Sequence, residues 1–186
     1  MRRNTFDLIT SSVGLLLAVL LLVAGGLLFW AYNFINTQVQ QQLTEQQITF
    51  PAANSAALKA LPAADASAMK PYAGQLMSNG AQAKTYADHF IAVHLKEIGG
   101  GKTYSQLSAQ SQANPGNAAL KAQVDTLFQG NTLRGLLLNA YAFWQIGQIA
   151  LIAAIVAFAA GVIMLVLAVL GFWHRRRTPA DAVLNA

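Results

Sequence analysis

Two long apolar segments dominate the pattern of hydrophobic and polar positions along the chain. Residues 8–34 and 149–170 contain no acidic or basic side chain. At a rise of about 1.5 Å per residue, the roughly 22 residues of the second segment cover ~33 Å of helix, enough to cross a hydrocarbon layer of about 30 Å. The pattern therefore predicts two transmembrane helices.

Aromatic side chains mark the ends of both apolar segments. Tryptophan and tyrosine prefer the interface between membrane and water, where the ring meets the apolar layer and the polar atom meets water. We therefore assign the first span to residues 8–34 and the second to residues 141–173, with an interfacial lead-in before its apolar core. The candidate interface anchors are Trp30, Tyr32, Tyr141, Trp144 and Trp173.

Basic side chains precede the first span and follow the second. They are Arg2, Arg3, Arg175, Arg176 and Arg177. Such residues are retained on the cytoplasmic side of a plasma membrane. We therefore expect a helical hairpin in which residues 1–7 and 174–186 are cytoplasmic and residues 35–140 are extracytoplasmic. A cleaved signal peptide is the main alternative, but the first apolar run is longer than a usual signal and no small-x-small cleavage site follows it.

The residues between the spans favour short helices. A polar continuation of the first span should stop near residues 48–51, where β-branched residues and proline intervene. Residues 52–70 should form short helical pieces and loops. A helix opened by Pro71 should run to the glycines at 99–101, and at most a short amphipathic piece should follow.

A last helix in this region is predicted over residues 118–129, with Gly130 as its stop and Asn131 or Thr132 as the cap of the next helix. Strand signals are weak throughout. The predicted fold class is therefore an all-α membrane protein with a helical extracytoplasmic domain between two transmembrane helices. Leu136, Leu137 and Leu138, together with Leu133, should stand above the bilayer and be buried against this domain or another subunit.

Composition supports the membrane class. The chain has 186 residues, of which 55% are hydrophobic and only 10% are charged, against about 25% charged residues in soluble domains. The formal net charge of +5 comes largely from the two basic ends, which argues against nucleic acid as a partner. The absence of cysteine means that the fold does not depend on disulfides.

Candidate chemistry is sparse. Asp88, His89 and His94 carry metal-ligating groups, but histidines five residues apart point about 140° away from each other on a helix, unlike the i, i+4 pair that shares a metal. We therefore expect no metal, and His94 as a core histidine with one hydrogen-bond partner. Gly99–Thr103 lacks the earlier glycine and the preceding strand of a phosphate loop. No nucleophile has a converging base, so we expect neither a catalytic site nor a cofactor.

Small residues recur inside both spans. They are Gly14 and Ala18 in the first and Ala150, Ala154, Ala157 and Gly161 in the second. Such residues let helices approach closely, so this face should pack the two spans together or join neighbouring copies. The alternative is that alanine and glycine are simply common in membrane helices.

Four segments carry a resemblance to a known family: MRRNTFDLITSSVG, KTYADHFIAVHL, GGGKTYSQLS and TLRGLLLNAYAFWQIGQIAL. Together they resemble a family of small two-span membrane proteins from mycobacteria and related actinobacteria. Some members carry an automatic label as aromatic ring-opening dioxygenases. That label implies iron held by two histidines and a carboxylate, a set that the spacing of Asp88, His89 and His94 does not supply.

The sequence therefore favours a non-enzymatic plasma-membrane protein whose partners are the lipid bilayer and either further copies of itself or a larger envelope complex. The alternative is a subunit of an oligomeric pore or transport system. The spans lack the ionisable residues that proton relays and coupled transporters use. A third reading is an envelope enzyme acting through Asp88, His89 or Tyr104.

Overall fold

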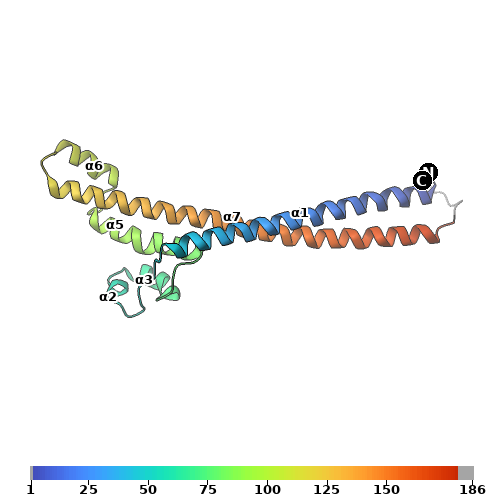
Figure 1. Cartoon of the computed structure of the whole chain (residues 1–186), viewed down its shortest axis with the longest axis horizontal. Helices are drawn as coiled ribbons and strands as arrows, with labels where there is room; N and C mark the ends of the chain where they lie inside the picture. Colours follow the sequence, from blue (N-terminus) through green and yellow to red (C-terminus); the bar gives the residue numbers. More distant parts are fainter. Residues whose placement is uncertain (1, 180–186) are drawn as a thin grey trace. The chain divides into compact units, whose positions relative to one another are not determined.

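The computed structural model describes residues 2–179 of the chain (Figure 1). It is 82% helical and has no strand among these residues, which confirms the predicted all-α class. Residue 1 and residues 180–186 of the predicted cytoplasmic ends lie outside the described part. The elements are α1 (Arg3–Glu45), α2 (Ala56–Lys59), α3 (Ala63–Met69), the 3₁₀ turn η1 (Lys70–Tyr72), α4 (Gly80–Tyr86), the π-helical turn η2 (Ala87–Ile91), α5 (Ala92–Ile98), α6 (Tyr104–Ala113) and α7 (Ala118–Arg177).

The chain divides into two compact units. The first, here called the paired-helix unit, contains residues 2–34 and 147–179 of the described part. The second, here called the central unit, is Ile35–Ile146. The long helices α1 and α7 contribute to both units, and both are long and apolar enough to cross a membrane.

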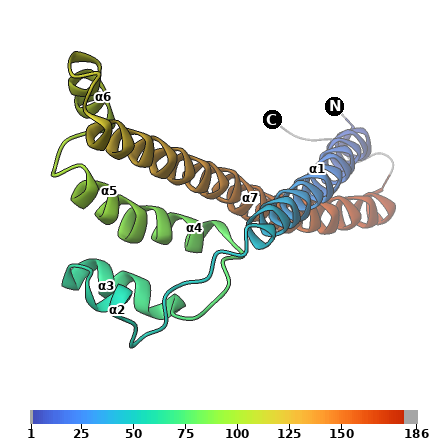
Figure 2. The same ribbon diagram turned by 60° about the vertical axis from the view of Figure 1, so that its left-hand side comes forward.

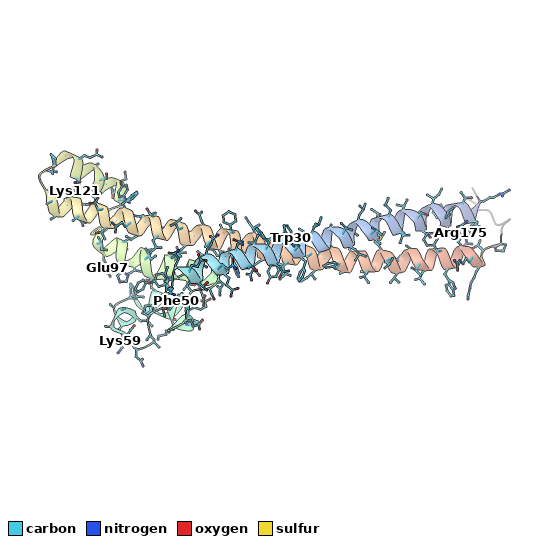
Figure 3. All side chains as sticks on the ribbon, viewed as in Figure 1. Trp30, Phe50, Lys59, Glu97, Lys121 and Arg175 are labelled. Carbon is cyan, nitrogen blue, oxygen red and sulfur yellow. The ribbon has the colours of Figure 1, made fainter. Side chains whose placement is uncertain are left out.

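Large apolar side chains of the paired-helix unit point outward. Only 11% and 17% of the residues are buried in the most apolar windows of α1 and α7. Leu16 and Ile152, for example, are exposed over 60% and 63% of their surface. The sticks in Figure 3 show such side chains along both helices, including the labelled Trp30. A soluble protein would bury its most apolar helices, so these surfaces fit lipid.

Small residues fill the contact between α1 and α7 in the paired-helix unit. A Cβ atom at Gly14 would lie 3.6 Å from Cβ of Ala168, and one at Gly25 would lie 3.0 Å from the Phe158 ring. The earlier residue of α1, Gly14, thus meets the later residue of α7, and Gly25 meets the earlier one. The two segments therefore run antiparallel. The residues of this small-residue seam recur every seven positions: Ser11, Ala18 and Gly25 on α1, and Gly147, Ala154, Gly161 and Ala168 on α7, all buried. This spacing is the repeat of a left-handed helix pair.

Polar contacts link the start of α1 to the end of α7 in the same unit. The Arg3 guanidinium lies 3.2 Å from Nε2 of His174, and Arg175 Nε donates to Asn4 Oδ1 at 2.6 Å. The first and last turns of the antiparallel pair are therefore joined by hydrogen bonds.

The core of the central unit is built from residues far apart in the sequence. Figure 2 shows α4 and α5 between α7 and the α2–α3 segment. Phe50 is 2% exposed, and its ring centroid lies 5.3 Å from those of both Tyr72 and Tyr86. The other buried members of the core are Val39, Leu43, Leu58, Leu61, Met69, Met77, Ala83, Ala87, Ile91 and Leu137.

Several predicted boundaries are confirmed. Helix α1 ends at Glu45, shortly before the predicted stop, and residues 52–70 contain the short helices α2 and α3. Helix α5 ends at Ile98, and Gly100 and Gly101 then adopt positive φ angles of 57° and 79°. The glycine run is therefore a helix exit, since other residues rarely adopt these angles.

The predicted helix start at Pro71 is wrong. Pro71 lies in η1, and the chain then pairs with the segment after α1: Phe50 N donates to the Gln75 carbonyl at 2.9 Å, and Met77 N donates to the Ile48 carbonyl at 2.8 Å. Helix α4 begins only at Gly80, where the Asn79 side chain accepts a hydrogen bond from Gln82 N. A long-range backbone pairing thus overrides the local helix signal.

The predicted helix stop at Gly130 is also wrong, because α7 continues without interruption to Arg177. A Cβ atom at Gly130 would collide with the Leu95 side chain. The glycine therefore permits close packing of α5 on α7, and Asn131 and Thr132 bond back to carbonyls of the preceding turn as interior helix residues. Helix α6 is likewise longer than the predicted short piece, with a capping box formed by Thr103 and Gln106.

Of the leucines near position 136 that were expected to be buried against this domain or another subunit, one lies in the core of the central unit. Leu137 is 2% exposed and joins the core of the central unit. Leu136 is 61% exposed and Leu133 is 36% exposed. Consecutive residues on a helix point about 100° apart, so a single packed face cannot cover them all.

Candidate functional site

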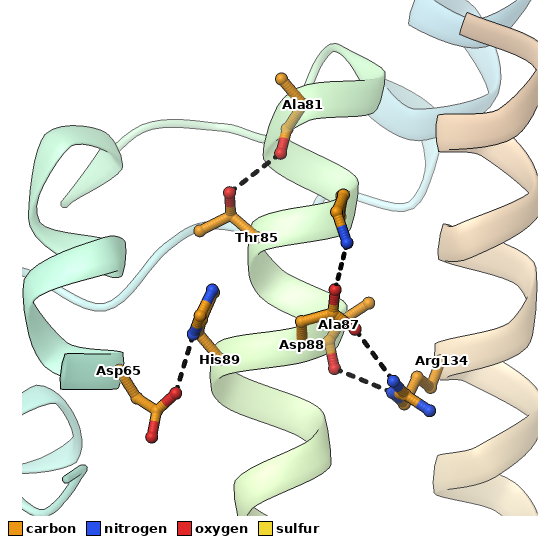
Figure 4. Close-up of polar contacts among 8 residues, drawn as sticks. Asp65, Ala81, Thr85, Ala87, Asp88, His89 and Arg134 are labelled. Atoms are coloured by element: carbon orange, nitrogen blue, oxygen red, sulfur yellow. Dashed lines mark hydrogen bonds and ion pairs between the residues drawn. The ribbon is translucent and has the colours of Figure 1, made fainter. Parts of the chain in front are cut away.

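The densest polar cluster of the central unit surrounds η2. Asp88 accepts a hydrogen bond from Lys84 Nζ at 2.5 Å and another from Arg134 Nη2 at 2.9 Å (Figure 4). Arg134 Nε also donates to the Ala87 carbonyl at 3.2 Å. A guanidinium on α7 thereby holds both a side chain and a backbone group of the π-helical turn. We call Lys84, Asp88 and Arg134 the Asp88 network.

The charges of this network stabilise one another. Partial burial of Asp88 works against its charged form, but the hydrogen bonds and positive charges of Lys84 and Arg134 outweigh burial and lower the pKa of Asp88 below 3.8. The hydrogen bond and negative charge of Asp88 raise the pKa of Lys84 above 10.5. Both groups are therefore ionised at neutral pH, which suits a structural ion network and not a general acid or base working near neutrality.

The two candidate histidines have separate partners. His89 Nδ1 lies 2.7 Å from Asp65 Oδ1 and so connects η2 to α3. His94 is half-buried, its Nδ1 lies 2.7 Å from the Phe90 carbonyl, and its ring lies 4.4 Å from the Phe90 ring. Within residues 2–179, no three histidine, aspartate or glutamate side chains come close enough to hold a metal ion. The structure thus separates the three residues considered as metal ligands.

The glycine-rich turn borders an open groove of about 580 Å³ between α5, the start of α6 and α7. Its lining residues are Leu95, Lys96, Gly101, Lys102, Thr103, Tyr104, Ser105, Leu127, Phe128, Asn131 and Thr132. This set includes hydroxyl groups but no histidine or carboxylate that could act as a base. The Thr103 hydroxyl caps α6 by accepting from Gln106 N at 3.3 Å. The hydroxyl groups of this groove therefore have no histidine or carboxylate beside them among the lining residues.

The predicted interface anchors fall into two groups. Trp30 and Trp173 are 64% and 52% exposed in the paired-helix unit, and the Arg177 guanidinium stacks 3.8 Å from the Trp173 ring centroid. Tyr32 is half-buried. In the central unit, Lys84 Nζ lies 5.4 Å from the Tyr141 ring centroid, and Trp144 packs against Gly80 so closely that no Cβ would fit there. Tyr141 and Trp144 therefore also hold α4 against α7.

The basic residues beside the spans lie at the ends of the paired helices, and the predicted small-residue face lies mostly at the contact between them. Arg3 and Arg175 make the contacts described above, and Arg2 and Arg176 are exposed. Of the small-residue face, Gly14, Ala18, Ala154, Ala157 and Gly161 are buried between α1 and α7, and Ala150 is half-buried. These residues pack within one chain.

Sequence reasoning missed the contacts that hold the central unit together. Asp88 and Arg134 are 46 positions apart, and Asp65 and His89 are 24 positions apart. Residues so far apart in the sequence leave no local pattern from which their contact could be predicted. The one available signal was the position of Arg134, a lone charge within an otherwise uncharged run from Thr126 to Trp173.

Comparison of the chain with protein-family models, with curated proteins and with solved structures finds no match in any of the three. Function is therefore inferred from the residues of the chain itself. The part of the chain that the structure describes offers an ion network, a histidine–aspartate pair and an open groove, and these groups do not converge on a common point.

Proposed function

We propose that this chain is a two-pass plasma-membrane protein that works without catalysis, as an oligomeric or accessory component of an envelope complex. In this proposal, α1 and α7 cross the membrane as a hairpin with both ends in the cytoplasm. The central unit is extracytoplasmic and provides a rigid helical surface for other proteins.

The proposal depends on one observation in the paired-helix unit: the residues at the contact between α1 and α7 are small, and the residues on the outward surface are large and apolar. Glycine, alanine and serine occupy the contact between the helices, whereas leucine, isoleucine and valine face outward. Helices in lipid associate through close packing of small residues, since burying large apolar side chains against each other gains little over contact with acyl chains. The arrangement thus favours a lipid-embedded pair.

The role of the polar groups supports a binding function over an enzymatic one. Asp88, Arg134 and His89, the groups best suited to acid–base or anion chemistry, each contact a different helix of the central unit. Their interactions fix the positions of α3, η2 and α7 relative to one another. A domain stabilised in this way suits a scaffold that presents a fixed surface.

Purification from native membranes in a mild detergent tests the proposal. We expect a particle heavier than the 19.8 kDa chain in native mass spectrometry, with a fixed ratio of subunits. Liposomes that contain only this protein should show no flux of ions or small solutes. A monomer without partners would contradict the scaffold proposal, and solute flux would favour the pore alternative.

A further inference from the structure

One face of α7 in the central unit is left uncovered by the other described residues of that unit. It comprises Gln129, Thr132, Leu136, Asn139, Phe143 and Ile146, all exposed. Leu136, Phe143 and Ile146 expose 61%, 60% and 54% of their surfaces. We call these six residues the outward stripe. From Thr126 to Ile146 the helix carries one charged residue, Arg134, and that residue contacts η2 on another face.

The outward stripe has the spacing of a coiled-coil contact. Its residues alternate three and four positions apart, which keeps them on one line along a helix that winds around a partner helix. The opposite side of α7 is already occupied by its own domain, where Leu137 is in the core and Gly130 meets Leu95. Apart from Thr132, which also lines the groove beside α6, the stripe faces away from these contacts, and its lack of charge matches the centre of a protein interface.

Asn139 and Gly135 favour a second copy of α7 as the partner helix, packed closely and in parallel. In parallel coiled coils, a single asparagine among apolar contact positions pairs with its copy and fixes the register. Asn139 lies between the apolar contact positions Leu136 and Phe143, and the two other polar residues of the stripe, Gln129 and Thr132, precede this apolar part. A Cβ atom at Gly135 would meet nothing within 4 Å, so this glycine is not required by packing inside the chain, although it costs about 1 kcal/mol relative to alanine in a helix. A close approach by another helix beside the stripe accounts for its position.

We infer that the outward stripe binds the same stripe of a second copy of this chain, in parallel. This inference rests on the proposed membrane location, because every copy then inserts in the same orientation and α7 can meet its own symmetry mate. A two-fold axis places each stripe residue opposite its equivalent. Leu136 and Phe143 then bury each other's surfaces, and the two Asn139 amides hydrogen-bond to one another.

Cysteine cross-linking in native membranes tests this arrangement on a clean background, since the chain contains no cysteine. We expect Leu136→Cys, Asn139→Cys and Phe143→Cys to give a disulfide-linked species of doubled mass under mild oxidation, because equivalent Cα atoms lie within disulfide reach. The matched control is Gln145→Cys, which is exposed but lies about 200° around the helix from Phe143. It should give no doubled species.

A charge-introducing variant provides a second readout. Leu136→Glu should shift the native mass of the purified particle down by loss of the self-contact, while the helical circular dichroism remains unchanged because Leu136 lies outside the core. Absence of cross-links at all three stripe positions, or equal cross-linking at Gln145, would overturn the inference. If a heavier particle containing other proteins persists in that case, the scaffold proposal stands and only self-association through the stripe is lost.

Discussion

The paired-helix unit and the central unit bury opposite kinds of side chain. In the paired-helix unit, large apolar residues are exposed and small residues lie at the contact. In the central unit, Phe50, Met69 and Met77 are almost fully buried. In both units a glycine lets two helices approach closely, since Gly161 contacts Leu22 and Gly130 contacts Leu95. Close helix packing is therefore common to both units, and the two units differ in where they place their large apolar side chains.

Two adjacent leucines of α7 give the largest contrast. Leu137 is 2% exposed and Leu136 is 61% exposed. Leu137→Ala should lower the free energy of unfolding of the central unit by about 2–5 kcal/mol, because it removes buried surface and leaves a cavity. Leu136→Ala should change the free energy of unfolding of the monomer, at protein concentrations too low for self-association, by less than about 0.5 kcal/mol. Urea unfolding of the purified protein in detergent measures both. Equal losses would contradict the assignment of the core.

Two adjacent glycines of α1 test the small-residue seam. A Cβ atom at Gly25 would lie 3.0 Å from the Phe158 ring, whereas one at Gly26 would meet nothing within 4 Å. Gly25→Leu should therefore destabilise the paired helices by about 1–3 kcal/mol through overpacking. Gly26→Leu should be neutral or slightly stabilising. Thermal unfolding in detergent micelles is the measurement, and matching behaviour of the two variants would show that the seam is misplaced.

The Asp88 network should contribute less than the core. Arg134→Met removes the only hydrogen bonds from α7 to η2 within the described residues and leaves Asp88 with Lys84 alone. We expect a loss of about 1–3 kcal/mol, the range for unpairing a partly buried polar group. Lys84→Gln should cost only about 0.3–0.5 kcal/mol, as for exposed i, i+4 pairs. Faster amide exchange in η2 of the Arg134→Met variant would locate the effect, and unchanged exchange there would contradict it.

The smallest predicted effect is a pH dependence of the central unit. The folded pKa of Asp88 is lowered, so its contribution to stability is present above the ordinary pKa of 3.8 and is lost as the pH falls through the folded value. The folded pKa of Lys84 is raised, so its contribution is present below 10.5 and is lost as the pH rises through the folded value. Unfolding midpoints of Asp88→Asn should vary less with pH at the acid end. A profile identical to that of the unsubstituted protein would refute the role of Asp88.

The sequence predicted those parts of the fold that follow from local pattern. The two long apolar helices, the all-α class and the exit at Gly99–Gly101 depend on hydropathy and on glycine conformations, which are readable residue by residue. The errors at Pro71 and Gly130 have the opposite cause. In each case a tertiary contact decided the outcome: the backbone pairing of Gln75 and Met77 with the chain after α1, and the close approach of Leu95 to α7.

The candidate site was less predictable than the fold. His89 and Asp88 attracted interest as ligands because of their side-chain chemistry, but their partners Asp65 and Arg134 come from other helices. Only the folded chain brings these side chains together. The sequence indicated that Leu136 needs a contact partner. It did not show that the exposed stripe continues through Asn139 and Phe143, because the sequence does not show which face of α7 packs on its own domain.

The proposed function requires that the paired helices cross a membrane and that the central unit lies outside the cytoplasm. The most direct test is labelling of Gln112→Cys and Arg176→Cys, two exposed positions, in otherwise cysteine-free protein with a membrane-impermeant maleimide. In intact cells, Gln112→Cys on the central unit should react, and Arg176→Cys at the basic flank should react only after the membrane is permeabilised. Labelling of Arg176→Cys in intact cells, with Gln112→Cys protected, would contradict the account.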